Sequence, residues 1–137
     1  MRRVNAKAFL DTNIIIYAFS SNDQRRDKAE ALLHAGGIIS VQVLNEFVNV
    51  SRRKIHRDWD EIQDALTILR ALLDPPQPLT IDTHEVAIGI AREYGFGFYN
   101  ALIVAAALRA GCPMLYSEDL HSGQVIERLT IHSPFVD

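Results

Sequence analysis

The sequence predicts an α/β protein, a three-layer α/β/α sandwich with a parallel sheet of about five strands. Short apolar runs alternate along the chain with longer segments whose apolar residues recur at helical spacing, which is typical of parallel sheets. The short runs do not alternate with polar residues, as expected for strands that helices cover on both faces. Right-handed crossover connections place helices on both sides of such a sheet.

Composition indicates one globular domain over residues 1–137. Hydrophobic residues make up 48% of the chain and charged residues 23%, which excludes a disordered or fibrous protein. The single cysteine, Cys112, excludes a disulfide framework and a four-cysteine zinc site. No apolar run approaches the roughly 18 residues of a membrane span. We therefore expect a cytoplasmic protein with no membrane partner.

Five short apolar runs are the expected strands. Each is bounded by turn residues or by the start of a helical pattern, and each is too short for a helix. They are residues 6–10, 38–40, 79–81, 113–116 and 129–132.

Helical spacing and stop signals define the segments between these strands. Residues 14–19 begin a helix after the first strand, and the pattern resumes over 27–35 until two consecutive glycines end it. Residues 41–54 form a helix directly after the second strand. The sheet edge that follows the first two strands is therefore the place where these helices begin.

The second half of the chain has clearer helix starts. Residues 58–61 match a capping box with Asp as the cap, and an amphipathic stripe follows until a proline cluster ends it. Residues 82–85 repeat the capping-box spacing and predict a second helix that ends at Gly95. An Ala-, Leu- and Val-rich helix over 100–110 precedes the fourth strand.

Polar residues near the ends of the expected strands are the candidate site. Asp11 follows the first strand, Glu46 lies in the helix after the second, and Asp119 follows the fourth, while Asn100 begins the Ala-rich helix. Carboxyl ends of parallel strands meet at one edge, so these side chains should converge. Each residue alone is explained as a helix cap, a turn residue or a solvated side chain. Together, the carboxylates would repel one another unless a cation such as Mg²⁺ neutralised them.

Four ordered segments of the chain resemble the motifs of PIN domains, most closely those of VapC-type toxins from bacterial toxin–antitoxin pairs. The segments are residues 9–13, 40–47, 99–107 and 115–120, and the resemblance covers the whole chain. It implies a Mg²⁺ or Mn²⁺ site and cleavage of single-stranded RNA that leaves 5′-phosphate and 3′-hydroxyl ends. It also implies a homodimer and a cognate VapB-like antitoxin.

The same resemblance assigns roles to individual residues. It implies catalytic and metal-binding roles at Asp11, Glu46, Asn100 and Asp119, with supporting hydroxyl groups at Thr12 and Ser117. Asn100 departs from the family, which has Asp at this place, and Asn offers a metal a carbonyl oxygen without a charge. The expected function is a Mg²⁺/Mn²⁺-dependent endoribonuclease weakened at position 100. The alternative is a catalytically inactive PIN-fold binding module that holds RNA or a protein partner.

The distribution of charge also bears on RNA. A net charge of −3 argues against a general nucleic-acid-binding protein. The one dense basic cluster comprises Arg52, Arg53, Lys54, His56 and Arg57. It is interpreted either as a solvated helix end, where cations favour the helix dipole, or as a strip that contacts phosphates near the site.

Single residues exclude three other enzyme classes. A receiver domain requires a lysine after a late strand, whereas the last lysine here is Lys54. A haloacid-dehalogenase-type phosphatase requires an Asp two residues after the first one, where this chain has Asn13. The glycine-lysine loop of P-loop NTPases does not occur in the sequence.

Overall fold

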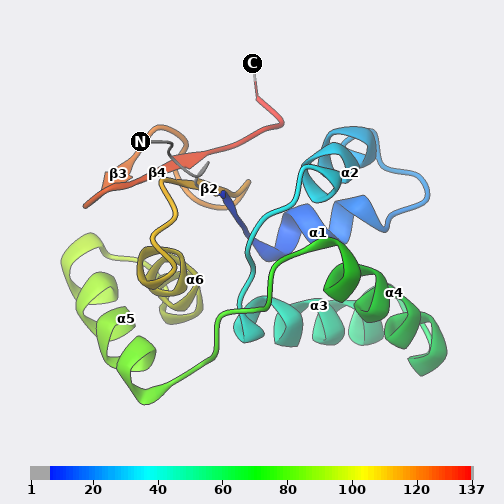
Figure 1. The fold of residues 1–137 in the computed structure, drawn as a ribbon, viewed down its shortest axis with the longest axis horizontal. Coiled ribbons are helices and arrows are strands. Elements are labelled where there is room, and N and C mark those ends of the chain that lie inside the picture. The colour runs from blue at the N-terminus through cyan, green and yellow to red at the C-terminus, as the bar shows by residue number, and fades with distance from the viewer. Residues whose placement is uncertain (1–6, 137) are drawn as a thin grey trace, which may run out of the picture.

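A computed structural model describes residues 7–136 of the chain. Ala6, the first residue of the predicted first strand, lies outside this range. The elements, in chain order, are β1 (Phe9–Leu10), α1 (Thr12–Ala18), α2 (Arg26–His34), α3 (Val41–Arg53), α4 (Trp59–Leu72), α5 (Ile81–Tyr94), α6 (Phe98–Arg109), β2 (Met114–Tyr116), β3 (Val125–Ile126) and β4 (Leu129–His132). The predicted α/β class is confirmed (Figure 1).

The described residues form a sheet of four strands in the order β1-β2-β4-β3. β1 pairs with β2 in parallel, and β2 pairs with β4 in parallel. β3 is antiparallel to β4 and forms one edge, which the sequence pattern did not indicate. The parallel register places Leu10 beside Tyr116, so the chain leaves both strands at the same end of the sheet.

Two isolated parallel bridges continue the sheet beyond β1. Ile38 bridges to Phe9, and Ser40 bridges to Gln77. The predicted second strand therefore contacts the sheet at each of its ends without forming a longer ladder. The prediction of a strand over 79–81 is wrong. Prolines around Gln77 lack a backbone N–H and limit pairing there, and the chain turns directly into α5.

The helix starts depend on which side chain captures the first free amides. The predicted capping box of α4 is confirmed, because Asp58 accepts a hydrogen bond from the Glu61 amide and Glu61 accepts one from the Asp58 amide. The box predicted over 82–85 is wrong, since Thr80 caps α5 by accepting from the Thr83 amide. The Thr80 hydroxyl accepts a hydrogen bond from a free amide of the first helical turn, which is the interaction that the Asp82 carboxylate was expected to make.

The core gathers around α6 and the strands. Residues 101–107 of α6 are all buried, which explains why its sequence is apolar on every side. Figure 1 shows α5 and α6 together at the left and α1 to α4 together at the right, with the strands above. Among the described residues, no helix is both long and apolar enough to cross a membrane.

Candidate active site

Asp11 sits where β1 ends and α1 begins. Its carboxylate caps α1 by accepting a hydrogen bond from the Thr12 amide at 2.7 Å. The second carboxylate oxygen accepts a hydrogen bond from the Ser117 hydroxyl, also at 2.7 Å. Ser117 directly follows β2, and the Asp11 amide donates to the Tyr116 carbonyl at 3.0 Å. The parallel pairing of the two strands therefore fixes this contact between residues 106 positions apart.

Glu46 reaches the same place from α3. Its Oε1 accepts a hydrogen bond of 2.6 Å from the Thr12 hydroxyl, and its Oε2 accepts one of 3.0 Å from the Gln42 side chain. Gln42 lies one turn before Glu46 on the same helix face, a spacing at which side chains meet. Both oxygens are thus oriented, and Thr12 links the helices that carry Asp11 and Glu46.

Ser117 also shapes the turn that carries Asp119. Its hydroxyl oxygen accepts hydrogen bonds from the amides of Asp119 at 3.2 Å and Leu120 at 3.3 Å. Because the same hydroxyl donates to Asp11, one buried side chain joins the first and last predicted acids. The supporting role of Ser117 in the site stays a prediction.

The pKa of Asp11 depends on its burial and on the other acids nearby. The pKa of Asp11 is raised to about 6, mainly by burial and to a smaller extent by the nearby carboxylates of Glu46 and Asp119. Hydrogen bonds from Ser117 and the Thr12 amide oppose these effects by stabilising the charged form. Asp11 is only 3% exposed, so its charge is weakly solvated and favours a nearby cation.

A cavity of about 310 Å³ lies beside this cluster. Its lining includes Glu46 and Asp119, together with Thr12, Asn13, Ile16, Asn49, Val50 and Tyr99. A neighbouring cavity of about 370 Å³ shares Glu46, Asn49 and Tyr99. Two carboxylates, amide groups and an aromatic ring that is 65% exposed therefore face a space open to a ligand. Asp11 lines neither cavity and lies beneath the residues that do.

Asn100 lies close to the cavities without lining either of them. α6 begins at Phe98 with Gly97 as its cap, so Asn100 is the third residue of the helix and is half-buried. The preceding residue, Tyr99, lines both cavities. The structure thus brings five predicted residues together, whereas Asn100 lines neither cavity. The five are Asp11, Thr12, Glu46, Ser117 and Asp119.

Asn13 is a site residue that the sequence pattern did not single out. Its carbonyl oxygen accepts a hydrogen bond from the Glu118 amide at 3.2 Å. Its Nδ2 is buried and has no hydrogen-bond partner, although the residue lines the 310 Å³ cavity. A buried donor without a partner is costly in a protein, and here it adjoins a space that a ligand can occupy. Only the tertiary contact with Glu118 reveals this role.

Glu118, between the two predicted site residues, is anchored by groups from the start of the chain. Its carboxylate forms an ion pair of 2.9 Å with Arg25 and accepts a hydrogen bond from the Tyr17 hydroxyl. Burial and this hydrogen bond raise the pKa of Tyr17 to about 12. The Arg25 guanidinium also stacks over the Tyr17 ring at 3.8 Å. These contacts hold the turn between Ser117 and Asp119 against α1.

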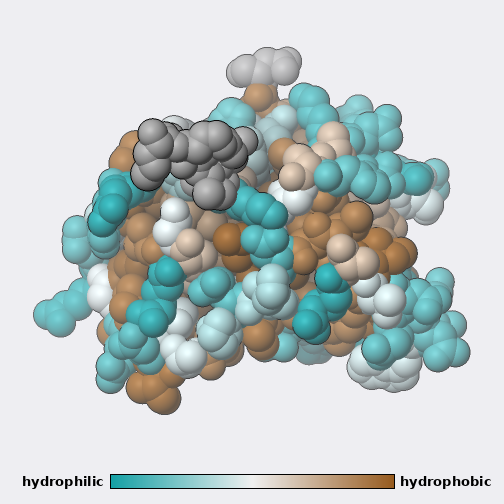
Figure 2. All heavy atoms as spheres, in the orientation of Figure 1, coloured by the Kyte–Doolittle hydropathy of each residue, from teal (hydrophilic) through white to brown (hydrophobic). Residues whose placement is uncertain are grey.

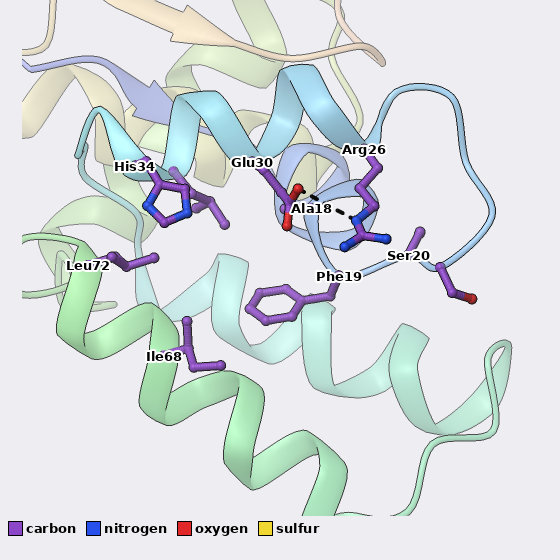
Figure 3. Close-up of a pocket in the computed structure, with 10 residues that line it drawn as sticks. Ala18, Phe19, Ser20, Arg26, Glu30, His34, Ile68 and Leu72 are labelled. Atoms are coloured by element: carbon purple, nitrogen blue, oxygen red, sulfur yellow. Dashed lines mark ion pairs between the residues drawn. The ribbon is translucent and has the colours of Figure 1, made fainter.

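A separate apolar groove lies between the end of α1, α2 and α4. Its cavity of about 350 Å³ has Phe19, Leu33, Ile68 and Leu72 among its lining residues. Figure 3 shows Phe19 and Ile68 facing the groove, with the Arg26–Glu30 ion pair at its rim. Hydrophobic surface is visible over the same region in Figure 2, between α2 and α4. No predicted catalytic residue lies in this groove.

The carboxylates fit a divalent ion of the magnesium type. Within residues 7–136, no three His, Cys, Asp or Glu side chains form a ready-made metal cage. Mg²⁺ needs no such cage, because waters and substrate phosphates complete its octahedral shell around one or two carboxylates. Glu46 and Asp119 supply two carboxylates at one cavity, and the charge of Asp11 lies next to them.

Comparison with known proteins identifies the family. The PIN domain profile matches residues 8–125, whereas curated proteins give no significant sequence match. VapC20 of Mycobacterium tuberculosis, a sarcin-ricin loop cleaving toxin, is 21% identical, with a TM-score of 0.69 over 82% of this chain and 89% of that one. A toxin–antitoxin complex from Klebsiella pneumoniae is 24% identical, with a TM-score of 0.70 over 93% and 98%. VapBC2 from Rickettsia felis, bound to a DNA fragment from its promoter, is 21% identical, with a TM-score of 0.66 over 92% and 97%. The matched profile spans most of the chain, and the chain belongs to the PIN domain family.

Proposed function

We propose that this protein is a divalent-metal-dependent endoribonuclease that cleaves single-stranded RNA. The observation that carries the proposal is that Glu46 and Asp119 line one cavity and that buried Asp11, from a third part of the chain, lies close enough for both to affect its pKa. A buried acid whose pKa is raised by burial and by neighbouring carboxylates is costly for the fold and is typical of functional sites. VapC20, which shares the fold, is a sarcin-ricin loop cleaving toxin.

Each residue of the cluster has a distinct task in this proposal. Glu46 and Asp119 would hold Mg²⁺ or Mn²⁺ at the cavity, and Asp11 would contribute negative charge from below. The bound ion would polarise a phosphate oxygen and lower the pKa of a coordinated water. Thr12 keeps Glu46 in place through its 2.6 Å hydrogen bond. Asn13 lines the same cavity, and its buried Nδ2 has no hydrogen-bond partner.

The reaction would be hydrolysis of a phosphodiester by in-line attack of water. The water adds to phosphorus as the bond to the 3′-oxygen breaks, and the 3′-oxygen takes up a proton. The products carry 5′-phosphate and 3′-hydroxyl ends. Positioning and charge neutralisation contribute most of the rate in such sites.

Asn100 favours a second candidate function, an inactive binding module. The family has Asp where this chain has Asn, so one negative charge is missing near the cavity. A neutral ligand weakens metal binding and leaves the fold intact. Under this alternative the chain would bind RNA or a protein partner without cleaving it.

One cleavage assay separates the two functions. A labelled single-stranded RNA is incubated with Mg²⁺ or Mn²⁺ over a range of concentrations, using the natural chain and its Asn100→Asp variant. In the Asn100→Asp background, Asp11→Asn, Glu46→Gln and Asp119→Asn should each nearly abolish cleavage, whereas Glu85→Gln on the exposed face of α5 should not. Full activity in excess chelator, or in any of the three site variants, contradicts the mechanism. Metal-independent binding without cleavage by either version favours the binding module.

We also propose a cognate antitoxin and a homodimer as partners. Two structures that share the fold are toxin–antitoxin assemblies. The groove of Figure 3 combines an apolar floor with Arg26, Glu30 and His34 at its rim, which suits an amphipathic helix. Ile68 in this groove is 48% exposed, and Ile68→Glu should reduce co-purification of a co-expressed antitoxin from the adjacent reading frame.

Two results would contradict the partner proposal. If light scattering gives the monomer mass at micromolar concentration, the homodimer is wrong. If no neighbouring-gene product co-purifies with the natural chain, the antitoxin is wrong. Thr67→Glu, at an exposed position of α4 that does not line this groove, is the control for the Ile68 variant.

A further inference from the structure

Trp59 is an exposed aromatic side chain at an unusual place. It is the only tryptophan of the chain, it is the first residue of α4, and it is 60% exposed. The Arg52 guanidinium lies over its ring at 4.6 Å from the centroid. Burial of a tryptophan normally stabilises a core strongly, so exposure at this level is not explained by folding.

The cations around Trp59 are not used in ion pairs. Arg52, Arg53 and Lys54 end α3 and are exposed. Within the described chain, no carboxylate pairs with any of them. Asp58 and Glu61 are engaged in the capping box of α4, and the exposed Asp60 forms no ion pair with these cations in the described part of the chain. The helix dipole favours cations at the end of α3, but it does not account for the stacked tryptophan.

The turn between α3 and α4 holds these groups in a defined arrangement. Arg57 anchors the turn, since its Nη2 donates to the Phe19 carbonyl at 2.6 Å and its amide donates to the Ser51 carbonyl at 2.9 Å. Arg52 donates to the Arg57 carbonyl at 3.1 Å. His56 adopts a left-handed backbone with a φ of 63°. Arg52 is therefore positioned before any ligand binds.

α3 connects this surface to the candidate active site. Glu46, Asn49 and Val50 on one face of the helix line the 310 Å³ cavity. Arg53 follows Asn49 by one turn and Glu46 by two on the same face. At a rise of about 1.5 Å per residue, Arg53 lies about 10 Å beyond Glu46 along the helix. A strand that leaves the cavity along α3 reaches Arg53 and then the Arg52–Trp59 pair.

We infer that the end of α3 and the start of α4 form a platform for single-stranded RNA that leads away from the active site. A base stacks on the exposed Trp59 ring, while Arg52, Arg53 and Lys54 neutralise neighbouring phosphates. Aromatic stacking combined with cations along a groove is the general mode of sequence-tolerant single-strand binding. The inference rests on the proposed function, because it assumes that the cavity takes RNA.

A protein partner is a poorer match for this surface. The platform is dominated by charge, whereas the apolar groove of Figure 3 offers a continuous hydrophobic lining to a protein helix. Charged residues are depleted from the centre of protein interfaces. Unpaired cations beside an exposed ring fit a phosphate backbone and its bases better.

Trp59 supplies its own probe for the test. The full chain is titrated in excess chelator with a single-stranded 2′-O-methyl RNA of about ten nucleotides, a length within the usual site size, and Trp59 emission is recorded. Saturable quenching is expected, and chelator prevents cleavage. Binding by Trp59→Ala and Trp59→Phe is followed by anisotropy of a labelled oligonucleotide. Trp59→Ala should weaken binding about tenfold, and Trp59→Phe should restore most of it.

The cations are tested through salt dependence. Arg52→Gln and Arg53→Gln should each reduce the slope of log K against log salt by about 0.7, as expected when one phosphate contact is lost from a single strand. Arg92→Gln, an exposed arginine on α5, is the matched control and should leave the slope unchanged. Circular dichroism of each variant checks that it is folded.

The outcomes distinguish this inference from the proposed function. Quenching of Trp59 emission, together with the weaker binding expected of Trp59→Ala and the smaller salt slopes expected of the arginine variants, supports the platform. This holds even if the chain cleaves no RNA with any metal. If the chain cleaves RNA but Trp59→Ala binds the oligonucleotide as tightly as the natural chain, the platform is wrong and the nuclease stands. If a co-purified protein partner quenches Trp59 and the oligonucleotide does not, the surface is a protein interface and the inference is overturned.

Discussion

Replacing Asp11 with Asn should make the metal-free protein more stable at neutral pH while it removes nuclease activity. Asp11 is almost completely buried, and its carboxylate lies near those of Glu46 and Asp119. Burial keeps the ionised carboxyl poorly solvated, and both neighbours repel its charge. Asn has nearly the same shape but carries no charge to bury.

The size of the effect follows from the pKa of Asp11. That pKa rises from 3.8 to about 6 on folding. Because one pKa unit corresponds to about 1.4 kcal/mol, folding disfavours the ionised form of Asp11 relative to the protonated form by about 3 kcal/mol. The folded state holds the proton more tightly than the unfolded state does. The contribution of Asp11 to the free energy of unfolding is therefore fully present below about pH 4, and it is lost as pH rises through about 6.

A local cost reduces the gain from Asp11→Asn. The Ser117 hydroxyl already accepts the amides of Asp119 and Leu120. It therefore cannot easily accept the new side-chain N–H as well, and an unmet donor costs about 1 kcal/mol or more. We expect Asp11→Asn to raise the free energy of unfolding by about 1–2 kcal/mol at neutral pH.

The assay is urea denaturation of the natural chain and of Asp11→Asn in excess chelator, between about pH 4 and pH 8. The difference between the two chains isolates Asp11 from other groups, such as Asp23, whose pKa is lowered to about 2 by its hydrogen bonds to Arg25. The stability difference should grow with pH, and added Mg²⁺ should stabilise only the natural chain. Asp64→Asn, which removes an exposed carboxylate of α4, is the control. A difference that is independent of pH would refute the electrostatic reasoning.

Three further predictions concern position 100, the core and a helix cap. Asn100→Asp should raise Mg²⁺ affinity about tenfold, since even about 1.4 kcal/mol of added charge attraction has that effect; equal activity at limiting Mg²⁺ would show that position 100 is not a metal ligand. Phe47→Ala should cost about 3–5 kcal/mol of stability by denaturation, because Phe47 is fully buried, and a loss below about 1 kcal/mol would contradict its place in the core. Thr80→Ala should cost about 1 kcal/mol by removing the cap on the Thr83 amide, whereas Asp82→Ala should cost less.

Local interactions explain what the sequence predicted well. The capping box from Asp58 to Glu61 and the left-handed Gly95 at the end of α5 depend on residues only a few positions apart. Such features can therefore be predicted from the sequence alone. The Ala-, Leu- and Val-rich pattern over residues 100–110 likewise predicted a helix, and the structure shows residues 101–107 of this helix to be buried. Alternation of such helices with short apolar runs was sufficient for the α/β class, whereas the PIN family was indicated by the four segments that resemble its motifs.

Errors arose where a neighbouring residue or a longer-range contact decided the outcome. Thr80 and Asp82 both suit a helix cap, and the hydroxyl of Thr80 was the one that captured the amide of Thr83. The run at 79–81 has the composition of a strand, but sheet pairing stopped at Gln77 among the prolines. Composition does not reveal which of two adjacent segments reaches the sheet edge, because pairing depends on partners far along the chain.

The sequence by itself determined which acids the chain has near the expected strand ends, and the tertiary structure decided how they are held. The order of the acids and the absence of a carboxylate at position 100 are properties of the sequence. The raised pKa of Asp11, the hydrogen bond from Thr12 to Glu46 and the free amide of Asn13 exist only after folding. The physical reason is that burial and charge proximity are properties of three-dimensional neighbourhoods, which the parallel pairing of β1 with β2 creates.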